Sequence, residues 1–411
     1  MHPKMKRVYV GVDTHKKTHT AVIINCFAER LGEITIQNRP SEFEGFLTSV
    51  KDYTKRGIAP VFGLEDTTSS GRQLASFLLA HKKTVKQVGA SLTWSERKNQ
   101  PITHKTDSYD ALCIARVLLN KYDELPEADP RDIYWTLSML VGRRDAIVKS
   151  NTALKNQIHA NITHHYPSYK QFFAVFDCKA ALEFWERYPS PAKLNSVTTE
   201  ELAEFLHESS SGFFGMAKAE EILDLVARDG TTETGYQSVR DFLITTCVKE
   251  IKHNHQEIKK IETAIKTLMD ELGYRLETMI GIDLVTAAGF VSEIGDIGRF
   301  SSPDKLARYC GVAPIDYSSG EKERIMKNAQ GNRALYKLFH DLAARNISPG
   351  RKNGRPTNGI FYDYYQRKLT QGKTKHQAIV SVMRRLVNII YGMMKNRTEY
   401  IHPNIPDQTA G

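Results

Sequence analysis

Residues 8–13 read VYVGVD, and this short β-rich run that stops at an acid decides the fold of the first domain. A second run, PVFGL at residues 60–64, stops at Glu65 in the same way. Runs of this kind predict strands, and open α/β sheets carry their functional groups at the carboxyl ends of strands. We therefore expect Asp13 and Glu65 to lie together at one edge of a sheet.

The segments around these two runs predict the rest of an α/β domain. Two further β-rich runs lie between the acids, and apolar periodicity with turn residues marks helices and a last strand. The expected elements are strands at residues 19–26 and 33–37, a helix from a Ser41 and Glu44 capping box to about Tyr53, a helix at about residues 71–81 and a strand near Val85. This order of strands and helices is that of an RNase H-like (RuvC-like) α/β fold.

Two more acids open the next predicted helix. Asp107 and Asp110 lie three residues apart, so a helix that begins at Asp107 carries both carboxylates on one face. Carboxylates are the usual ligands of hard divalent cations, and a pair of such cations is a common means of cutting phosphodiester bonds. Each acid alone has a structural explanation, because acids favour the first turn of any helix. The four acids in this element order favour a metal site for an enzyme that acts on nucleic acid: Asp13, Glu65, Asp107 and Asp110.

Length and composition set the class of protein. The chain of 411 residues can bury two or more cores, and its formal charge of +10 with a pI of about 9.1 favours a polyanionic partner. Its five cysteines form no CxxC pair, so neither a zinc site nor a disulfide framework is indicated. No apolar run reaches membrane length and no secretory stretch opens the chain, so we expect a cytoplasmic protein without a membrane partner.

Charge is unevenly spread along the chain and marks regions. Residues 171–235 carry 5 Lys/Arg against 12 Asp/Glu, a net of −7, whereas residues 341–400 carry 12 against 3, a net of +9. We predict three regions from these shifts and the helical patterns. They are an RNase H-like domain at residues 1–125, a coiled-coil region at 126–275 with an acidic insertion at about 171–235, and a mainly α-helical domain at 276–411.

Two long helical patterns bracket the acidic insertion. From Ile133 to Ile158 and from Ile244 to Leu272, apolar residues recur at alternating spacings of four and three. Arg144 and Asn151 interrupt the first stripe. Because polar interruptions often specify register or oligomeric state, a dimerising coiled coil is favoured over the alternative, an intramolecular hairpin.

The C-terminal region carries two motifs. In residues 279–296, MIGIDLVTAAGFVSEIGD, Gly281 follows one helix and Thr286 opens the next, which predicts a helix-hairpin-helix that can hold a phosphate; a plain helical hairpin is the alternative. Residues 309–320, YCGVAPIDYSSG, predict a turn-rich loop that exposes a serine hydroxyl. Basic residues near these motifs and on the long helices are candidate nucleic-acid contacts: Arg143, Arg144, Lys322, Arg324, Lys327, Arg333, Arg384 and Arg385.

Together these motifs resemble the transposases of the insertion-sequence one-hundred-ten family. The resemblance rests on GVDTHK at residues 11–16, LEDTTSSGRQLA at 64–75, HKTDSYDALCIA at 104–115 and ARYCGVAPIDYSSG at 307–320. It covers nearly everything except the acidic insertion, with the motifs in the family's order. Enzymes of this family have an RNase H-like DEDD domain and a second domain that bears a catalytic serine.

The resemblance implies roles for particular residues. The nucleophilic serine corresponds to Ser319, and the adjacent Ser318 stays open as an alternative. The cofactor would be Mg²⁺, with Mn²⁺ as the alternative, and the family's metal-binding acids correspond to Asp13, Glu65, Asp107 and Asp110.

It also implies partners and a cellular setting. The family's enzymes form tetramers, as dimers of dimers, in which acids and serine from different subunits share a composite site. They join donor and target DNA through a phosphoserine intermediate, guided by a bridge RNA that the insertion sequence encodes. This chain would accordingly work beside the nucleoid of a prokaryotic cell.

Two other functions stay open at this point. The first is a metal-dependent, structure-specific endonuclease, similar to a junction resolvase, that uses water instead of a serine. The second is a noncatalytic protein that bridges nucleic acids and whose acids only cap strands and helices.

Overall fold

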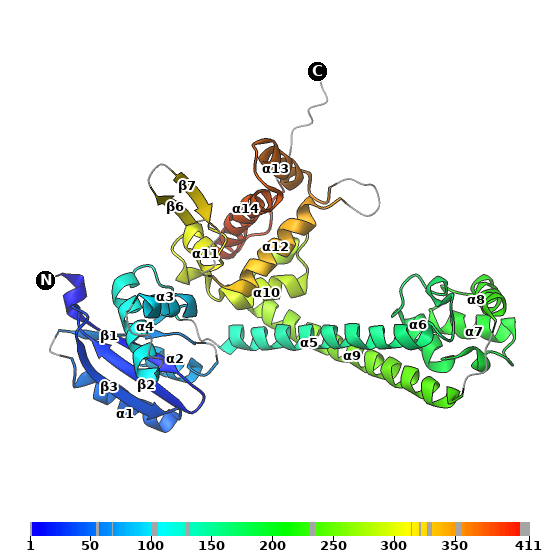
Figure 1. Cartoon of the computed structure of the whole chain (residues 1–411), viewed down its shortest axis with the longest axis horizontal. Coiled ribbons are helices and arrows are strands. Elements are labelled where there is room, and N and C mark those ends of the chain that lie inside the picture. The colour runs from blue at the N-terminus through cyan, green and yellow to red at the C-terminus, as the bar shows by residue number, and fades with distance from the viewer. Residues whose placement is uncertain are drawn as a thin grey trace, which may run out of the picture. The chain divides into compact units, whose positions relative to one another are not determined.

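The structure is a computed structural model, and Figure 1 shows the whole chain. The chain divides into two compact units, Met1–Met139 with Lys266–Gly411 and Leu140–Ile265. The described residues are 2–54, 57–67, 69–99, 106–128, 132–230, 235–313, 315–319, 322–326, 331–349 and 356–402. Among them, no helix combines the length and the apolar character needed to cross a membrane.

A mixed sheet of five strands forms the centre of the N-terminal domain. Its strands are β1 (Arg7–Thr14), β2 (Thr18–Ile24), β3 (Arg30–Gln37), β4 (Ala59–Leu64) and β5 (Thr84–Gln87), in the spatial order β3-β2-β1-β4-β5. β1 and β3 pair antiparallel with β2, whereas β4 lies parallel to both β1 and β5. The predicted α/β domain is confirmed, and the short 3-10 helix η1 (Pro3–Lys6) precedes it.

Helices cover both faces of this sheet (Figure 1). On one face, Val8, Val10 and Val12 of β1 pack in a core with α1 (Pro40–Lys51) and α2 (Arg72–Ala80). On the other face, Tyr9 shares a core with the apolar side of α4 (Asp107–Lys121). This alternation follows from the pleat of a strand, in which successive side chains point to opposite faces.

The start of α1 and the presence of α3 (Ala90–Lys98) differ from the prediction. α1 begins at Pro40 after Arg39, without a side-chain cap, so the predicted Ser41 and Glu44 capping box is wrong. Proline at the first position presets the backbone angle for a helix and needs no hydrogen-bond partner there. α3 was not predicted because it has no apolar stripe, Thr93 being its only buried residue.

Two long helices, α5 (Asp132–Ile162) and α9 (Gln237–Leu272), pack against each other within the chain. Nε of Arg144 lies 2.8 Å from Oε1 of Glu262, and the Asn254 side chain donates to Oδ1 of Asn151 at 2.8 Å. Both polar interruptions of the first stripe therefore have a partner in the same chain. For these residues the structure shows the intramolecular hairpin, which was the alternative to the favoured dimerising coiled coil. Pairing of the hairpin with another chain stays a prediction.

The acidic insertion folds as a small helical layer against this hairpin. It contains α6 (Lys179–Arg187), α7 (Thr199–Ser209), α8 (Met216–Asp229) and the short helices η2 (Tyr169–Gln171) and η3 (Pro191–Lys193). Its core is aromatic, and the rings of Phe172 and Trp185 stack with centroids 5.7 Å apart. The described part of the insertion thus shares an apolar core with α5 and α9.

The C-terminal region is mainly helical, as predicted. It contains η4 (Leu276–Thr278), α10 (Leu284–Ile294), η5 (Ile297–Arg299), α11 (Pro303–Tyr309), α12 (Arg333–Ile347), α13 (Gly359–Thr370) and α14 (Lys375–Asn396). The apolar face of α14 packs against α11, α12 and α13. One hairpin, β6 (Ile315–Ser319) with β7 (Lys322–Met326), completes it.

Two details of this region correct the sequence analysis. α10 begins at Leu284 with Asp283 as its cap, whose carboxylate accepts from the Thr286 amide at 2.7 Å, so Thr286 lies inside the helix. The turn before it needs glycine, because Gly281 has a φ of +90°. The predicted turn-rich loop is instead a strand up to Ser319.

Candidate functional site

Asp13 and Glu65 lie side by side because of the register of two parallel strands. Val12 of β1 pairs with Leu64 of β4, so the residues that follow these two reach the same end of neighbouring strands. Neighbouring strands lie about 4.8 Å apart, which brings both acids to one edge of the sheet. The sequence predicted this placement from the two runs that stop at an acid.

A glycine in β1 lets α4 approach the strand closely, and this brings the third and fourth acids to the same edge of the sheet. Gly11 lies on the face of β1 that α4 covers, and a Cβ there would be 2.2 Å from both the Ala111 carbonyl oxygen and the Ala115 nitrogen. α4 therefore rests directly on β1. Asp13 is two residues beyond Gly11 and so belongs to the same face, toward the first turn of α4, where Asp107 and Asp110 lie.

The start of α4 is fixed by its cap. The Thr106 hydroxyl accepts from the Tyr109 amide at 3.2 Å, and Asp107 is the first helical residue, as the sequence predicted. With a spacing of three residues, Asp107 and Asp110 share a side of the helix. Asp107 is open to solvent, with 57% of its side chain exposed, whereas the Asp110 side chain is 12% exposed.

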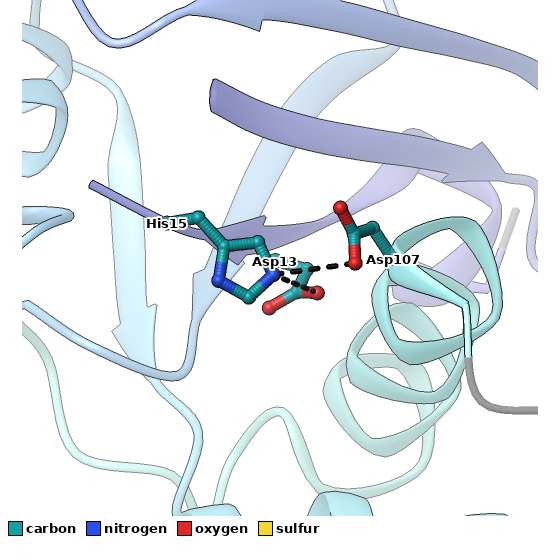
Figure 2. A group of neighbouring side chains, drawn as sticks. All are labelled: Asp13, His15 and Asp107. Carbon is teal, nitrogen blue, oxygen red and sulfur yellow. Dashed lines mark ion pairs between the residues drawn. The ribbon is translucent and has the colours of Figure 1, made fainter. Parts of the chain in front are cut away.

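A histidine links two of the acids, as Figure 2 shows. Nε2 of His15 lies 3.2 Å from Oδ2 of Asp13 and 3.3 Å from Oδ1 of Asp107. One ligand atom from each of these three residues lies within 4.8 Å of the other two, which is compatible with a divalent metal ion. Sequence reasoning missed His15, although it belongs to the quoted motif GVDTHK.

The electrostatics of the site disfavour the ionised forms of Asp13 and Glu65. Burial raises the pKa of the Asp13 carboxyl group, and the charges of Asp110 and Asp107 raise it further, while His15 lowers it. Burial likewise raises the pKa of Glu65, with added contributions from Asp13 and Asp110. A bound cation relieves this kind of crowding, and oxygen donors of this type suit Mg²⁺ or Mn²⁺. The residues present therefore fit a divalent cation.

A second partner for the acids comes from the unpredicted helix α3. Nη2 of Arg97 lies 2.5 Å from Oδ1 of Asp110, and both side chains are largely buried. The pair holds Asp110 at the edge of the site and supplies a positive charge beside it. No pattern in the sequence identified Arg97, because α3 lacks the apolar periodicity that marks a helix.

Polar contacts that the sequence did not single out connect described residues of the loop after Glu65. The Asp66 carboxylate accepts from the amides of Ser69 and Ser70 at 2.8 and 2.7 Å. Gly71 allows this loop to close, because a Cβ there would lie 2.0 Å from the Asp66 carbonyl oxygen. The Asn38 amide donates to the Ser70 carbonyl at 3.1 Å and joins the loop to the end of β3.

The candidate serines lie in the hairpin of the C-terminal region. Ser318 and Ser319 end β6, where their backbones pair with Glu323 and Lys322 of β7. Gly320, which follows them in the motif, lies outside the described residues.

The predicted nucleic-acid contacts fall into four groups. Arg143 and Arg333 are exposed, and Lys322 and Arg324 lie in β7, while Lys327 lies outside the described residues. The other three have partners within the chain: Arg144 pairs with Glu262, Arg384 with Asp304, and the Arg385 guanidinium lies 3.7 Å from the centroid of the Tyr364 ring. Contact with nucleic acid stays a prediction for all eight.

Comparisons with known proteins match both ends of the chain. Residues 10–167 match a family described as "Transposase", and residues 273–356 match the "Transposase IS116/IS110/IS902 family". The uncharacterized 44.8 kDa protein of insertion element IS116 from Streptomyces clavuligerus is 24% identical over the full length of both chains. The uncharacterized 43.6 kDa protein of insertion element IS110 from Streptomyces coelicolor is 26% identical, covering 72% of each chain. A pilin gene-inverting protein from Moraxella lacunata is 30% identical over 36% of this chain and 47% of its own length.

Proposed function

Because the chain belongs to the IS116/IS110/IS902 family of transposases, we propose that it cuts and rejoins DNA strands through a covalent link to a serine. The observation that carries this proposal is the meeting of acids from β1, β4 and α4 at one edge of the sheet. Burial of Asp13 and Glu65 beside other carboxylates costs folding stability, and arrangements of this kind cluster at functional sites. In a transposase, that use is the cleavage of phosphodiester bonds.

The acids would hold Mg²⁺, or Mn²⁺ in its place. The residues in this role are Asp13, Glu65, Asp107 and Asp110. When bound, the cation would draw charge from the phosphate oxygens and so stabilise the transition state. Arg97 would keep Asp110 in position through their ion pair.

Ser319 is the better candidate for the nucleophile, because in the sequence it corresponds to the family's serine and stands directly before Gly320. The adjacent Ser318 remains the alternative. The backbones of both serines pair with β7, at Lys322 and Glu323.

The covalent step conserves atoms and charge. The Ser319 oxygen forms a bond to phosphorus while the bond from phosphorus to the leaving sugar oxygen breaks. The serine releases a proton, and the leaving oxygen takes one up. Because one phosphoester replaces another, the strand can be rejoined to a new end without ATP, whereas attack by water would leave a free end.

An RNA encoded by the insertion sequence would determine which DNA target is recognised. A tetramer would bring the serine of one subunit and the acids of another together. The charge of +10 and the basic segment at residues 341–400 support a nucleic-acid partner. Purification of the chain from its host with nuclease inhibitors should yield a discrete structured RNA. Recovery of only heterogeneous RNA would contradict guidance by a bridge RNA.

The function is tested by trapping the DNA intermediate. The full chain is incubated with labelled DNA containing the element ends, the copurified RNA and Mg²⁺, and then separated on a denaturing gel. We expect a covalent protein–DNA adduct that migrates faster after protease digestion, because the protease removes most of the attached protein. Free cleaved ends without an adduct would support the junction-resolvase-like endonuclease, and binding without cleavage, unaffected by Mg²⁺, would support the noncatalytic bridging protein.

A further inference from the structure

His15 occupies the space between two of the acids that the proposed function assigns to the metal. Its Nε2 atom is nearly equidistant from the carboxylate oxygens of Asp13 and Asp107, at 3.2 and 3.3 Å. One N–H group can direct a linear hydrogen bond at only one acceptor. A cation among the three atoms, by contrast, can be contacted by all of them.

The backbone holds His15 in this position. The residue lies in the turn between β1 and β2, where its amide donates to the Thr18 carbonyl at 3.0 Å. The Asn38 side chain donates to the His15 carbonyl at 3.3 Å and also to Ser70 in the loop after Glu65. The turn that carries the imidazole is thus tied to the same loop that follows another metal-binding acid.

We propose that Nε2 of His15 is a ligand of the divalent cation, alongside the carboxylates of Asp13 and Asp107. This inference rests on the proposed function, because it concerns the same metal site. The His15 side chain is 51% exposed, so the imidazole ring can adjust to a bound ion without disturbing the core. An imidazole in the ligand set favours Mn²⁺ relative to Mg²⁺, because Mg²⁺ binds oxygen almost exclusively in proteins.

Pulsed EPR of Mn²⁺ bound to the full chain tests the assignment. We expect a ¹⁴N hyperfine coupling from an imidazole on the bound Mn²⁺, which His15→Gln removes. Loss of one ligand should also weaken Mn²⁺ binding by about tenfold or more. In His15→Asp, which replaces nitrogen by oxygen, the coupling should be absent while the preference shifts toward Mg²⁺.

His81 offers a matched control within the same domain. It is an exposed histidine whose Nε2 lies 3.4 Å from Oε2 of Glu44, a residue of α1 that is not one of the four acids. His81→Gln should keep both the coupling and the Mn²⁺ affinity of the wild-type chain. Asp13→Asn should remove the bound Mn²⁺.

The outcomes separate this inference from the proposed function. If Mn²⁺ binds in an Asp13-dependent way but shows no nitrogen coupling, the metal site stands and the role of His15 is wrong. A coupling that persists in His15→Gln would equally overturn it, since the nitrogen would belong to another residue. If the wild-type chain binds no Asp13-dependent Mn²⁺ at all, both the ligand assignment and the metal site of the proposed function fail.

Discussion

The acid site and the serine hairpin are built in different ways. The acids project from β1, β4 and α4, which buried side chains lock together on both faces of the sheet. Ser318 and Ser319 end a strand of five residues whose described backbone pairing is with one other strand, β7. A metal site needs several ligands at fixed spacing, so it lies on the rigid scaffold, whereas a nucleophile needs access to the DNA strand.

This difference divides the proposed chemistry between the two regions. Loss of an acid should remove the cation and stop cleavage, whereas loss of the serine should remove only the covalent link. These effects can be separated by substitutions in the acids, the serines and the scaffold. Substitutions of two arginines test binding to nucleic acid.

The largest effect is expected from the acids of the sheet edge. Asp13→Asn or Glu65→Gln should lower strand cleavage by about a thousandfold or more, because the charge that binds the cation is lost. Affinity for DNA and RNA, measured by filter binding, should persist. Asp123→Asn, an exposed acid of the same domain, serves as the control and should cleave normally. Full recombination by either site variant would refute the metal-site assignment.

The hairpin is tested by exchanging its two serines one at a time. Ser319→Ala should abolish the protein–DNA adduct, because it removes the proposed nucleophilic hydroxyl. Ser318→Ala should retain most of it. The adduct is measured on denaturing gels. Survival of the adduct in Ser319→Ala together with its loss in Ser318→Ala would reverse the choice between the serines.

The rigid scaffold is tested by adding a methyl group where α4 crosses β1. Gly11→Ala should destabilise the folded chain by about 3 kcal/mol or more, because the helix backbone must move away from the strand. Gly45→Ala, an exposed position in α1 with open space around it, should instead be neutral or stabilise by about 0.5–1 kcal/mol. Denaturant unfolding measures both values. Equal stabilities of the two variants would contradict the close approach of α4.

The site should also reveal itself in the pH dependence of stability. Burial raises the folded-state pKa of Asp13, so between its ordinary and raised values the folded chain binds more protons than the unfolded chain. The stability of the metal-free protein therefore falls as pH rises through the raised pKa. Asp13→Asn has no carboxyl group at this position, so its stability does not fall in this way. Without metal, it should be more stable than the wild type at neutral pH.

Well below pH 4, where Asp13 is protonated in both the folded and the unfolded chain, the difference in stability between the wild type and Asp13→Asn should vanish. Thermal unfolding in the presence of a chelator provides the measurement. Added Mn²⁺ at about 100 times its Kd should stabilise the wild-type chain by about 2.7 kcal/mol and leave the variant unchanged. A variant that is less stable at every pH would contradict the crowded-acid account.

The smallest effect distinguishes two neighbouring arginines of the helical hairpin. Arg143 is exposed, whereas Arg144 is paired with Glu262. If Arg143 contacts a phosphate, Arg143→Gln should reduce the slope of log affinity against log salt by about 0.7–0.9. Arg144→Gln should leave that slope unchanged. The reverse result would mean that the ion pair opens when nucleic acid binds.

Much of the acid site could be predicted from sequence because its signals are local. Short apolar runs that stop at Asp13 and Glu65 indicate strand ends, and the pair of acids at Asp107 and Asp110 indicates the first turn of α4. His15 and Arg97 escaped this reasoning. Their roles depend on a turn and on a helix without an apolar stripe, so only the folded structure brings them to the acids.

The serine hairpin was harder to predict. Proline, serine and glycine in residues 314–320 are typical of turns, so their composition hides the strand. The long helices posed a different difficulty. Their apolar periodicity is the same whether the partner helix belongs to the same chain or to another. The contacts of Arg144 and Asn151 show pairing within the chain and do not test pairing with a second chain.

Anomalous diffraction from crystals of the full chain soaked in Mn²⁺ tests the central claim most directly. We predict an anomalous peak bound to carboxylate oxygens of Asp13 and Asp107, with Glu65 and Asp110 beside it, at metal–oxygen distances of about 2.0–2.3 Å. A well-occupied Mn²⁺ elsewhere, with no peak among these acids, would contradict the account.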